Sequence, residues 1–299
     1  MRILYLGYGE IGCRCLKSLI SEGIEVTGAI PRSSDDGSGA QSNSVYKLAS
    51  ENGINILSHE DACKKARPEP LTNLDYLISV QYDRILNENW LSIPKTDTLN
   101  LHFSFLPRLR GCYPTKWAII EEQSTGVTLH SVDKGIDTGD ILDQQEVAIA
   151  SDETDASLYA KLNVTAVDLF NRNISSIVNK SFPKRRSQVD ENSSYHPKEM
   201  PWDGVLDLQN KLDFCDRFLR AFTFPPYPPA RCFLNDKEVG LHNPVHKEKK
   251  TGSTEPGNFH LSNNGLLAVE CLDGILYFDI LRVEGKQISP TKFLDGNLS

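Results

Sequence analysis

Short apolar runs alternate with amphipathic segments through the first half of the chain, and this alternation constrains the fold more than any other feature. Strand-like runs cover residues 2–9, 24–30, 54–58, 74–81 and 98–104. Helix-like segments cover residues 10–23, closed by Gly23, and 42–53, with Ser42 as the expected N-cap. Strands separated by helices predict an α/β fold with a mostly parallel sheet covered on both faces.

The second half of the chain changes from this pattern to short strands. A helix containing residues 116–123, strand-like runs at 126–132 and 141–149, and a helix from Asp152 to about Lys180 complete the first domain, predicted at residues 1–183. A polar segment and a short helix at 211–222, stopped by a proline cluster, form a predicted linker at 184–230. Short runs with Gly and Asn turns predict a small β-rich domain at 231–299.

The charge of the chain limits the partners that it can bind. Its 299 residues carry 32 Lys and Arg against 40 Asp and Glu, a formal net charge of −8. Nucleic-acid binders gain affinity by neutralising phosphates, so we expect no nucleic-acid partner. No apolar run reaches the roughly 20 residues of a membrane span, so we expect no membrane partner. No basic leader precedes the first apolar run, which predicts a cytoplasmic protein without a signal peptide.

The cysteines argue against a disulfide framework and against a metal site. The chain has seven cysteines, an odd number, and they form no C-x-x-C pair. This pattern favours reduced thiols and predicts no zinc site, so no metal is expected. The seven are Cys13, Cys15, Cys63, Cys112, Cys215, Cys232 and Cys271.

A glycine motif follows the first strand. Gly7, Gly9 and Gly12 fit the G-x-G-x-x-G pattern of dinucleotide sites, in which backbone amides approach a pyrophosphate. The acidic residue expected after the second strand is missing, because Pro31 and Arg32 stand there. Although Arg32 could accept a 2′-phosphate, we interpret the motif as a tight turn that packs a helix on a strand.

Polar residues gather at the end of the fifth strand-like run. Asn100, His102 and Ser104 alternate with Leu101 and Phe103, so the three polar side chains are predicted to share one face. The carboxyl ends of parallel strands are where open α/β sheets bind ligands. A single Asn or His there is usually a hydrogen-bonded core group, but the clustering favours a functional site.

Three aspartates follow in the glycine-rich loop SVDKGIDTGDIL. Asp133, Asp137 and Asp140 could belong to a solvated turn, which Asp and Gly favour. Alternatively, one carboxylate reaches His102, favours its charged form and orients it for proton transfer. Both interpretations stay open on the residues alone.

The segments NLHFSFLPRLRG and GVTLHSVDKGIDTGDIL resemble the N10-formyltetrahydrofolate-dependent formyltransferases. These include methionyl-tRNA formyltransferase, glycinamide ribonucleotide formyltransferase and the sugar N-formyltransferases of surface-polysaccharide synthesis. The resemblance continues through the linker segment FLRAFTFPPYPPA and the last β-rich segment, and so covers nearly the whole chain. It implies the formyltransferase fold, Rossmann-like, with an OB-like carboxyl-terminal domain, and a glycine turn that binds no nucleotide.

The resemblance also implies a catalytic set and a donor, N10-formyltetrahydrofolate. The Asn-x-His strand and the loop Asp of that family fall on Asn100, His102 and Asp137. Asn100 would bind the formyl oxygen, a protonated His102 would stabilise the oxyanion, and Asp137 would hold His102 charged and accept a proton from the amine. The donor is expected between two segments, with the contact residues Gln81, Tyr82, Asp83, Arg84, Ile85, Leu86, Asp133, Gly135, Ile136 and Asp140.

The acceptor has to be inferred from other residues. The loop PRSSDDGSGAQ holds one Arg and two Asp, where the tRNA enzyme typically has basic residues, and HKEKK is the strongest basic stretch. Aromatic residues near the linker resemble those of the sugar enzymes. We therefore expect a nucleotide-linked amino sugar, dTDP-linked and dideoxy, as in O-antigen and lipopolysaccharide synthesis. Its expected contacts are Ser104, Arg108, Arg110, Tyr113, Lys116, Trp117, Tyr195 and Trp202.

Two other functions stay open on the sequence. The first is methionyl-tRNA formyltransferase, which salt-sensitive tRNA binding would distinguish. The second is a relative that binds folate or nucleotide without turnover, against which the intact Asn100, His102 and Asp137 argue. A homodimer is expected from the related sugar enzymes.

Overall fold

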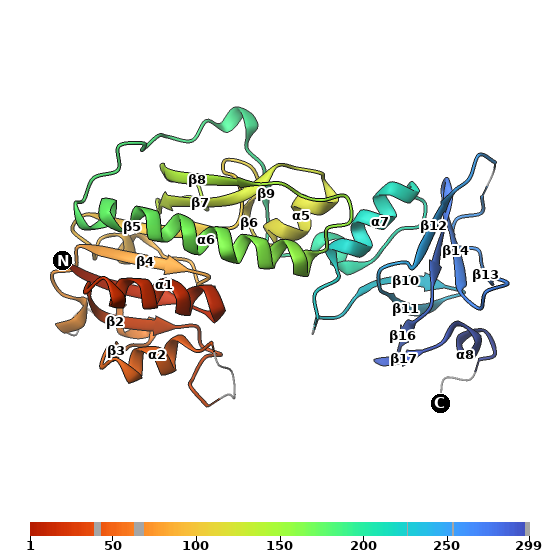
Figure 1. Cartoon of the computed structure of the whole chain (residues 1–299), viewed down its shortest axis with the longest axis horizontal. Coiled ribbons are helices and arrows are strands. Elements are labelled where there is room, and N and C mark those ends of the chain that lie inside the picture. Colours follow the sequence, from red (N-terminus) through yellow and green to blue (C-terminus); the bar gives the residue numbers. More distant parts are fainter. Residues whose placement is uncertain (39–42, 63–68, 226, 253, 297–299) are drawn as a thin grey trace. The chain divides into compact units, whose positions relative to one another are not determined.

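The computed structural model describes residues 1–38, 43–62, 69–225, 227–252 and 254–296 (Figure 1). The chain divides into two compact units, which are described separately below. The first comprises Met1–Gly111, Ser124–Ala148 and Lys161–Tyr195. The second comprises Cys112–Gln123, Ile149–Ala160 and His196–Ser299.

A seven-stranded sheet forms the centre of the first unit, in the order β3-β2-β1-β4-β5-β7-β8. The five strands β1 to β5 pair in parallel, whereas β7 is antiparallel to both β5 and β8. The predicted α/β fold with a mostly parallel sheet is confirmed. The strands are β1 (Arg2–Gly7), β2 (Glu25–Pro31), β3 (Asn55–Ile56), β4 (Tyr76–Val80), β5 (Asp97–His102), β7 (Thr125–Ser131) and β8 (Ile141–Val147).

The helices follow the apolar periodicity of the sequence. Helix α1 buries Ile11, Cys15, Leu16 and Leu19, which recur every three or four residues. Helix α2 is capped by Ser44, whose side chain accepts a hydrogen bond from the N–H of Lys47, whereas Ser42, the expected cap, lies outside the described residues. The helices are α1 (Gly9–Ser21), α2 (Val45–Glu51), α3 (His59–Ala62), α4 (Glu88–Leu91), α5 (Pro114–Ile120), α6 (Asp155–Val178), α7 (Leu212–Ala221) and α8 (Pro290–Leu294).

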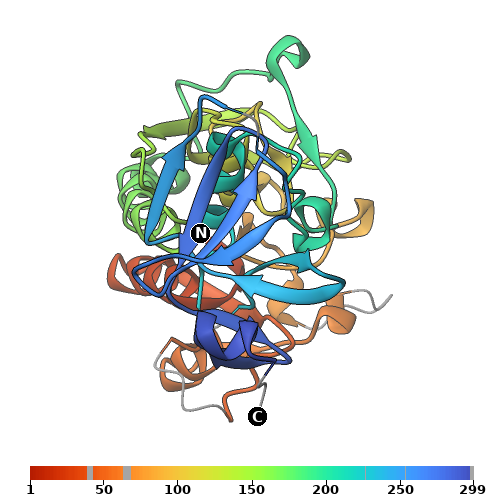
Figure 2. The same ribbon diagram turned by 90° about the vertical axis from the view of Figure 1, so that its right-hand side faces the viewer.

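The core of the first unit lies on both faces of this sheet. Leu4, Leu6 and Leu77 are fully buried and belong to one apolar cluster with Trp90 of α4. Burying one such leucine stabilises the folded state by roughly 1.5–3 kcal/mol. Helices α1 and α6 lie along the other face (Figures 1 and 2), where the buried Tyr5 hydroxyl donates to the carbonyl oxygen of Gly12 in α1. Among the described residues, no helix is long and apolar enough to cross a membrane.

The glycine motif at residues 7–12 provides close packing between β1 and α1. A Cβ on Gly12 would lie 3.3 Å from the carbonyl carbon of Gly7, and Gly9 adopts a left-handed φ of +66°. Only a residue without a side chain allows this approach at low cost. The geometry therefore supplies a packing reason for the glycines.

The second unit is rich in antiparallel β-structure (Figure 2). One four-stranded sheet has the order β10-β11-β16-β17 and the other β12-β15-β14-β13. The predicted β-rich carboxyl-terminal part is thus confirmed. The strands are β10 (Ala230–Leu234), β11 (Lys237–Leu241), β12 (His246–Lys249), β13 (Phe259–Leu261), β14 (Leu267–Cys271), β15 (Gly274–Phe278), β16 (Leu281–Val283) and β17 (Lys286–Ile288).

The polar segment after α6 packs within the first unit over residues 183–194, although the sequence suggested a linker from residue 184. The N–H and C=O of Arg186 exchange two hydrogen bonds with Ile141 of β8, at 2.8 and 2.9 Å. The Arg185 guanidinium lies 3.1 Å from carboxylates of both Asp97 and Asp140. Strands β6 (Arg110–Gly111) and β9 (Tyr195–His196) form a separate two-stranded ladder.

Candidate active site

Three polar side chains share one face of the sheet where β5 meets β7. Asn100 and His102 are two residues apart on β5, and His130 of β7 pairs directly opposite Asn100. The amide nitrogen Nδ2 of Asn100 lies 3.1 Å from His130 Nε2. Strand β5 ends at His102, so Ser104 lies in the following loop, fully buried.

The orientation of the Asn100 amide follows from the contacts of His130. The Nδ1 atom of His130 lies 2.7 Å from the carbonyl oxygen of Ser131, which can only accept, so Nδ1 carries the hydrogen. In a neutral ring, Nε2 is then an acceptor for one N–H of Asn100. The second N–H of this amide remains available for a ligand oxygen.

The carboxylate of Asp137 completes this cluster. Its Oδ2 lies 3.7 Å from Nδ1 of His102 and accepts a 2.8 Å hydrogen bond from the backbone N–H of Gly111. Its Oδ1 lies 3.5 Å from Nε2 of His130. Burial raises the pKa of Asp137, but the charge of His102 and the hydrogen bond from the Gly111 N–H act against it, and the pKa lies well below its usual range. The loop therefore presents an ionised carboxylate to the two histidines.

Both ring nitrogens of His102 face acceptors. Nε2 lies 3.0 Å from the carbonyl oxygen of Leu109, and Nδ1 faces the Asp137 carboxylate. A doubly protonated imidazolium satisfies both contacts, whereas a neutral ring leaves a lone pair against one acceptor. A protonated His102 would place a positive charge beside the amide N–H of Asn100, which is the arrangement that stabilises an oxyanion.

Residues 81–86, predicted as one wall of the donor site, directly follow β4. Gln81 adopts a left-handed φ of +58°, and the Tyr82 hydroxyl lies 2.9 Å from Nδ1 of His59. Asp83 and Arg84 form ion pairs with Arg32 at 2.6 Å and with Glu60 at 2.7 Å. Leu86 is buried in the core, whereas Ile85 is 77% exposed.

The second predicted wall is the loop between β7 and β8. Asp133 accepts hydrogen bonds from Gly135 N–H and the Thr138 hydroxyl, and Ile136 is exposed. Lys134 in this loop forms a 2.7 Å ion pair with Glu88, the first residue of α4. Because α4 begins shortly after residues 81–86, the ion pair connects the loop to the segment that follows the first wall. Asp140 is paired with Arg185 and Ser187, so its carboxylate is already engaged in this structure.

The predicted acceptor contacts fall in both units. Ser104, Arg108, Arg110 and Tyr195 belong to the first unit, and Tyr113, Lys116, Trp117 and Trp202 to the second. Two of the basic residues expected to contact the acceptor, Arg110 and Lys116, are buried. Arg110 donates to Gln188 and Asp190, and Lys116 donates to Asp155 at 2.6 Å.

Aromatic rings lie together within the second unit. Trp117 stacks on His196 with ring centroids 4.1 Å apart, and Trp202 lies 5.3 Å from Trp117. Trp202 is 54% exposed. An exposed indole on a stacked aromatic base provides a flat surface that a planar ring can cover.

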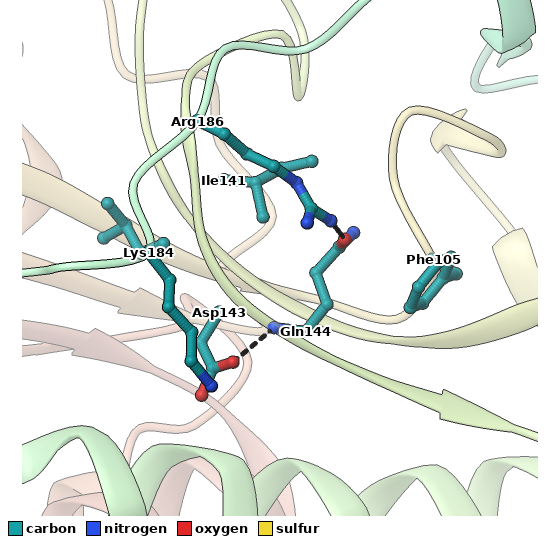
Figure 3. Close-up of a pocket in the computed structure, with 7 residues that line it drawn as sticks. Phe105, Ile141, Asp143, Gln144, Lys184 and Arg186 are labelled. Atoms are coloured by element: carbon teal, nitrogen blue, oxygen red, sulfur yellow. Dashed lines mark hydrogen bonds between the residues drawn. The ribbon is translucent and has the colours of Figure 1, made fainter.

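A cavity of about 220 Å³ lies along β8 in the first unit (Figure 3). None of the predicted site residues is in its lining, which consists of Phe105, Ile141, Leu142, Asp143, Gln144, Lys184 and Arg186. Within the described ranges, no group of three or more His, Cys, Asp or Glu side chains is arranged to hold a metal ion.

Two residues that the structure brings to this cluster could not be assigned from the sequence. His130 stands in the strand-like run GVTLHSV, where nothing local distinguishes it from an ordinary core histidine. Its position opposite Asn100 becomes visible only once β5 and β7 are paired. Gln188, in the polar segment 183–194, contacts the Asp137 loop, and no local sequence signal indicates this.

The comparison with known proteins agrees with this geometry. Residues 1–174 match the formyl transferase family, and residues 200–298 match the formyl transferase C-terminal domain. The bifunctional polymyxin resistance protein ArnA of Wigglesworthia glossinidia brevipalpis is 34% identical over 80% of this chain, which spans only 37% of that protein. The methionyl-tRNA formyltransferase of Geobacter sulfurreducens is 31% identical over 99% of this chain and 94% of that protein.

A solved structure shares the fold. WlaRD, a sugar 3N-formyl transferase crystallised in the presence of dTDP and 5-N-formyl-THF, superimposes with a TM-score of 0.70 at 24% identity, covering 93% of this chain and 96% of that one. The matches to both domains and the full-length sequence relatives agree on one conclusion. The chain belongs to the formyl transferase family and is an enzyme that transfers formyl groups.

Proposed function

We propose that this enzyme moves the formyl group of N10-formyltetrahydrofolate to the primary amine of a nucleotide-linked amino sugar, of the dTDP-linked dideoxy class. This choice of acceptor rests on the ion pairs that the cations in the loop after β2 and in and beside β12 form with carboxylates of the same chain. From the resemblance we also propose a cytoplasmic homodimer that acts in surface-polysaccharide synthesis, and size-exclusion chromatography with light scattering tests the dimer.

The proposed chemistry begins with attack of the acceptor amine on the formyl carbon. A C–N bond forms and the carbonyl electrons move to oxygen, giving a tetrahedral oxyanion that Asn100 N–H and the His102 imidazolium stabilise. The amine proton passes to Asp137, directly or through water. The bond from carbon to N10 then breaks, N10 takes up a proton, and tetrahydrofolate leaves.

Three observations support this donor. Asn100, His102 and Asp137 are held together within the first unit, with contacts of 3.1 to 3.7 Å that include His130. The two predicted walls of the donor site are linked by the ion pair between Lys134 and Glu88. WlaRD, which shares the fold, was crystallised with a formylated tetrahydrofolate.

The charges support a small acceptor over tRNA. Arg32 is the single cation in the loop that follows β2, and it is paired with Asp83 at 2.6 Å. In β12 and the residue after it, Lys247 is paired with Asp216 at 2.8 Å and Lys250 with Glu248 at 2.7 Å. Paired cations release fewer counterions from a nucleic acid, so these segments are poor phosphate contacts.

The aromatic surface of the second unit supports a nucleotide. Trp202, exposed and 5.3 Å from the stacked Trp117, offers a face for a planar base. The dTDP present with WlaRD is a ligand of this chemical class.

A second candidate is methionyl-tRNA formyltransferase. The observation that favours it is the 31% identity to the enzyme of Geobacter sulfurreducens over 99% of this chain. In that case, the tRNA contacts would have to come from cations outside the loop after β2 and outside β12.

A mass-shift assay separates the two candidates. Purified protein and N10-formyltetrahydrofolate are incubated with a panel of dTDP- and UDP-linked amino sugars and, separately, with charged initiator tRNA. We expect one formyl mass on a sugar nucleotide and a loss of about 100- to 1000-fold in rate for Asn100→Ala, which removes one oxyanion donor. Formylation of the tRNA alone would overturn the sugar assignment.

A further inference from the structure

Gln188 contacts the backbone of the loop that carries Asp137. Its side-chain Nε2 donates to the carbonyl oxygens of Asp137 at 2.8 Å and of Gly139 at 2.7 Å. Its Oε1 accepts from Nε and Nη2 of Arg110 at 3.1 and 2.9 Å. Both amide hydrogens and both lone pairs of the side chain are thereby used.

Arg110 connects the Gln188 side chain to the backbone that contacts His102 and Asp137. Its side chain is buried, and its chain neighbours both contact catalytic groups. Leu109 provides the carbonyl that accepts from His102, and Gly111 provides the N–H that donates to Asp137. A group that fixes Arg110 therefore acts on the partners of both His102 and Asp137.

The backbone of Asp137 needs external support. Its φ is +54°, in the left-handed region, which a residue with a side chain adopts less readily than glycine does, although Asp is among those that adopt it most often. Strained backbone of this kind persists only where surrounding contacts hold it. The two hydrogen bonds from Gln188, one to Asp137 itself, are contacts of this kind.

We propose that Gln188 is a positioning residue for formyl transfer. It acts through the backbone of residues 137–139 and through Arg110, and it sets the separation between the Asp137 carboxylate and His102. The inference rests on the proposed function, because it takes Asp137 and His102 as catalytic groups.

The variant Gln188→Glu tests this role with little change in shape. A carboxylate still accepts from Arg110, but it has no N–H for the two loop carbonyls and repels them. Displacing a catalytic group by about 1 Å can cost on the order of 100-fold in rate. We expect kcat to fall by about that factor, with both KM values within threefold of the wild type, since substrate binding is not directly altered.

A second measurement does not depend on the acceptor. The amide of Gly111, which donates to Asp137 Oδ2, is followed by nuclear magnetic resonance. In Gln188→Glu, we expect this amide to shift upfield and to exchange faster with solvent, while the amide of Leu101 in β5 stays protected. If no acceptor is formylated by the wild type, the proposed function fails, but the Gly111 amide still reports on Gln188.

The control variant is Gln287→Glu, which makes the same change of charge at an exposed position of β17. It should keep the wild-type kcat. Should Gln188→Glu not fold, Gln188→Met, of similar length and uncharged, replaces it with the same expected changes. A folded variant with wild-type kcat and an unchanged Gly111 amide would overturn the proposal. Failure of both variants to fold would also overturn it, since the role would then be structural.

Discussion

At the scale of single residues, the Asp137 carboxylate joins three groups of the cluster, namely His102, His130 and the N–H of Gly111. Its pKa is lowered in the folded protein, so as the pH falls the unfolded chain takes up this proton first. The ionised carboxylate therefore stabilises the folded state above its unfolded pKa of about 3.9, and this stabilisation is lost as the pH falls toward the lower folded value.

Asp137→Asn removes this dependence on pH. Below about pH 4, the free energy of unfolding of the wild type should fall more steeply than that of the variant, by at most about 1.4 kcal/mol per pH unit. Urea unfolding at pH 7, 5, 4 and 3.5 measures both slopes. Glu51→Gln, at the exposed end of α2, should keep the wild-type slope. Equal slopes for Asp137→Asn and the wild type would contradict the argument.

The sequence pointed to some residues of this cluster and not to others, and the difference has a physical reason. Asn100 and His102 are close in sequence, and the pattern of the loop left three aspartates open, of which the resemblance to the formyltransferases singled out Asp137. His130 and Gln188 contribute through strand pairing and through a segment far along the chain. Ser104 was expected on the strand face, but β5 ends two residues earlier, because the chain leaves the sheet there.

At the scale of elements, the loop between β7 and β8 depends on glycine. A Cβ on Gly139 would lie 2.0 Å from the carbonyl oxygen of Ser131, a backbone atom that cannot rotate away. Adding a methyl group must therefore move the loop that carries Asp137. The same backbone is held by Gln188 through the Gly139 carbonyl.

Gly139→Ala should lower formyl transfer by at least about 100-fold, because the displaced loop takes the carboxylate away from His102. Gly252→Ala is the matched control, since a Cβ there meets nothing within 4 Å and its activity should stay at the wild-type level. Steady-state rates with the acceptor found by the mass-shift assay measure both. Wild-type turnover in Gly139→Ala would mean that the loop adjusts without moving the carboxylate.

The strand pattern was predictable from the alternation of apolar runs, whereas the direction of the last two strands was not. Residues 126–132 and 141–149 were expected as strands, and β7 and β8 occupy them. Only the pairing shows that β7 runs antiparallel to β5, which places His130 opposite Asn100.

At the scale of the whole molecule, the cysteines serve as small apolar side chains. In the part of the chain that the structure describes, six cysteines lie outside any disulfide, and Cys112 is the exposed one among them. Burial raises the pKa of Cys13 to about 11 and that of Cys232 to about 12. Such thiols are rarely ionised near neutral pH and so react slowly.

Alkylation of the native protein should therefore select by position. At pH 7.5, iodoacetamide should modify the exposed Cys112 first. In proportion to the smaller fraction of thiolate, Cys13 should react on the order of 100-fold and Cys232 on the order of 1000-fold more slowly than an ordinary exposed thiol. Peptide mapping by mass spectrometry at timed intervals measures the rates, and unfolding in urea should make them similar. Equal rates in the native protein would show that these side chains are reached by solvent.

The backbone pairing between Arg186 and Ile141 has a consequence for the protein in concentrated solution. Unpaired edges of a sheet are templates for association between chains. Here one edge, β3, has only two residues, and the start of the other, β8, is already hydrogen-bonded by Arg186. The segment whose Gln188 contacts the Asp137 loop thus also covers the start of the β8 edge. If this segment detached, we expect that edge to become open to pairing with neighbouring chains.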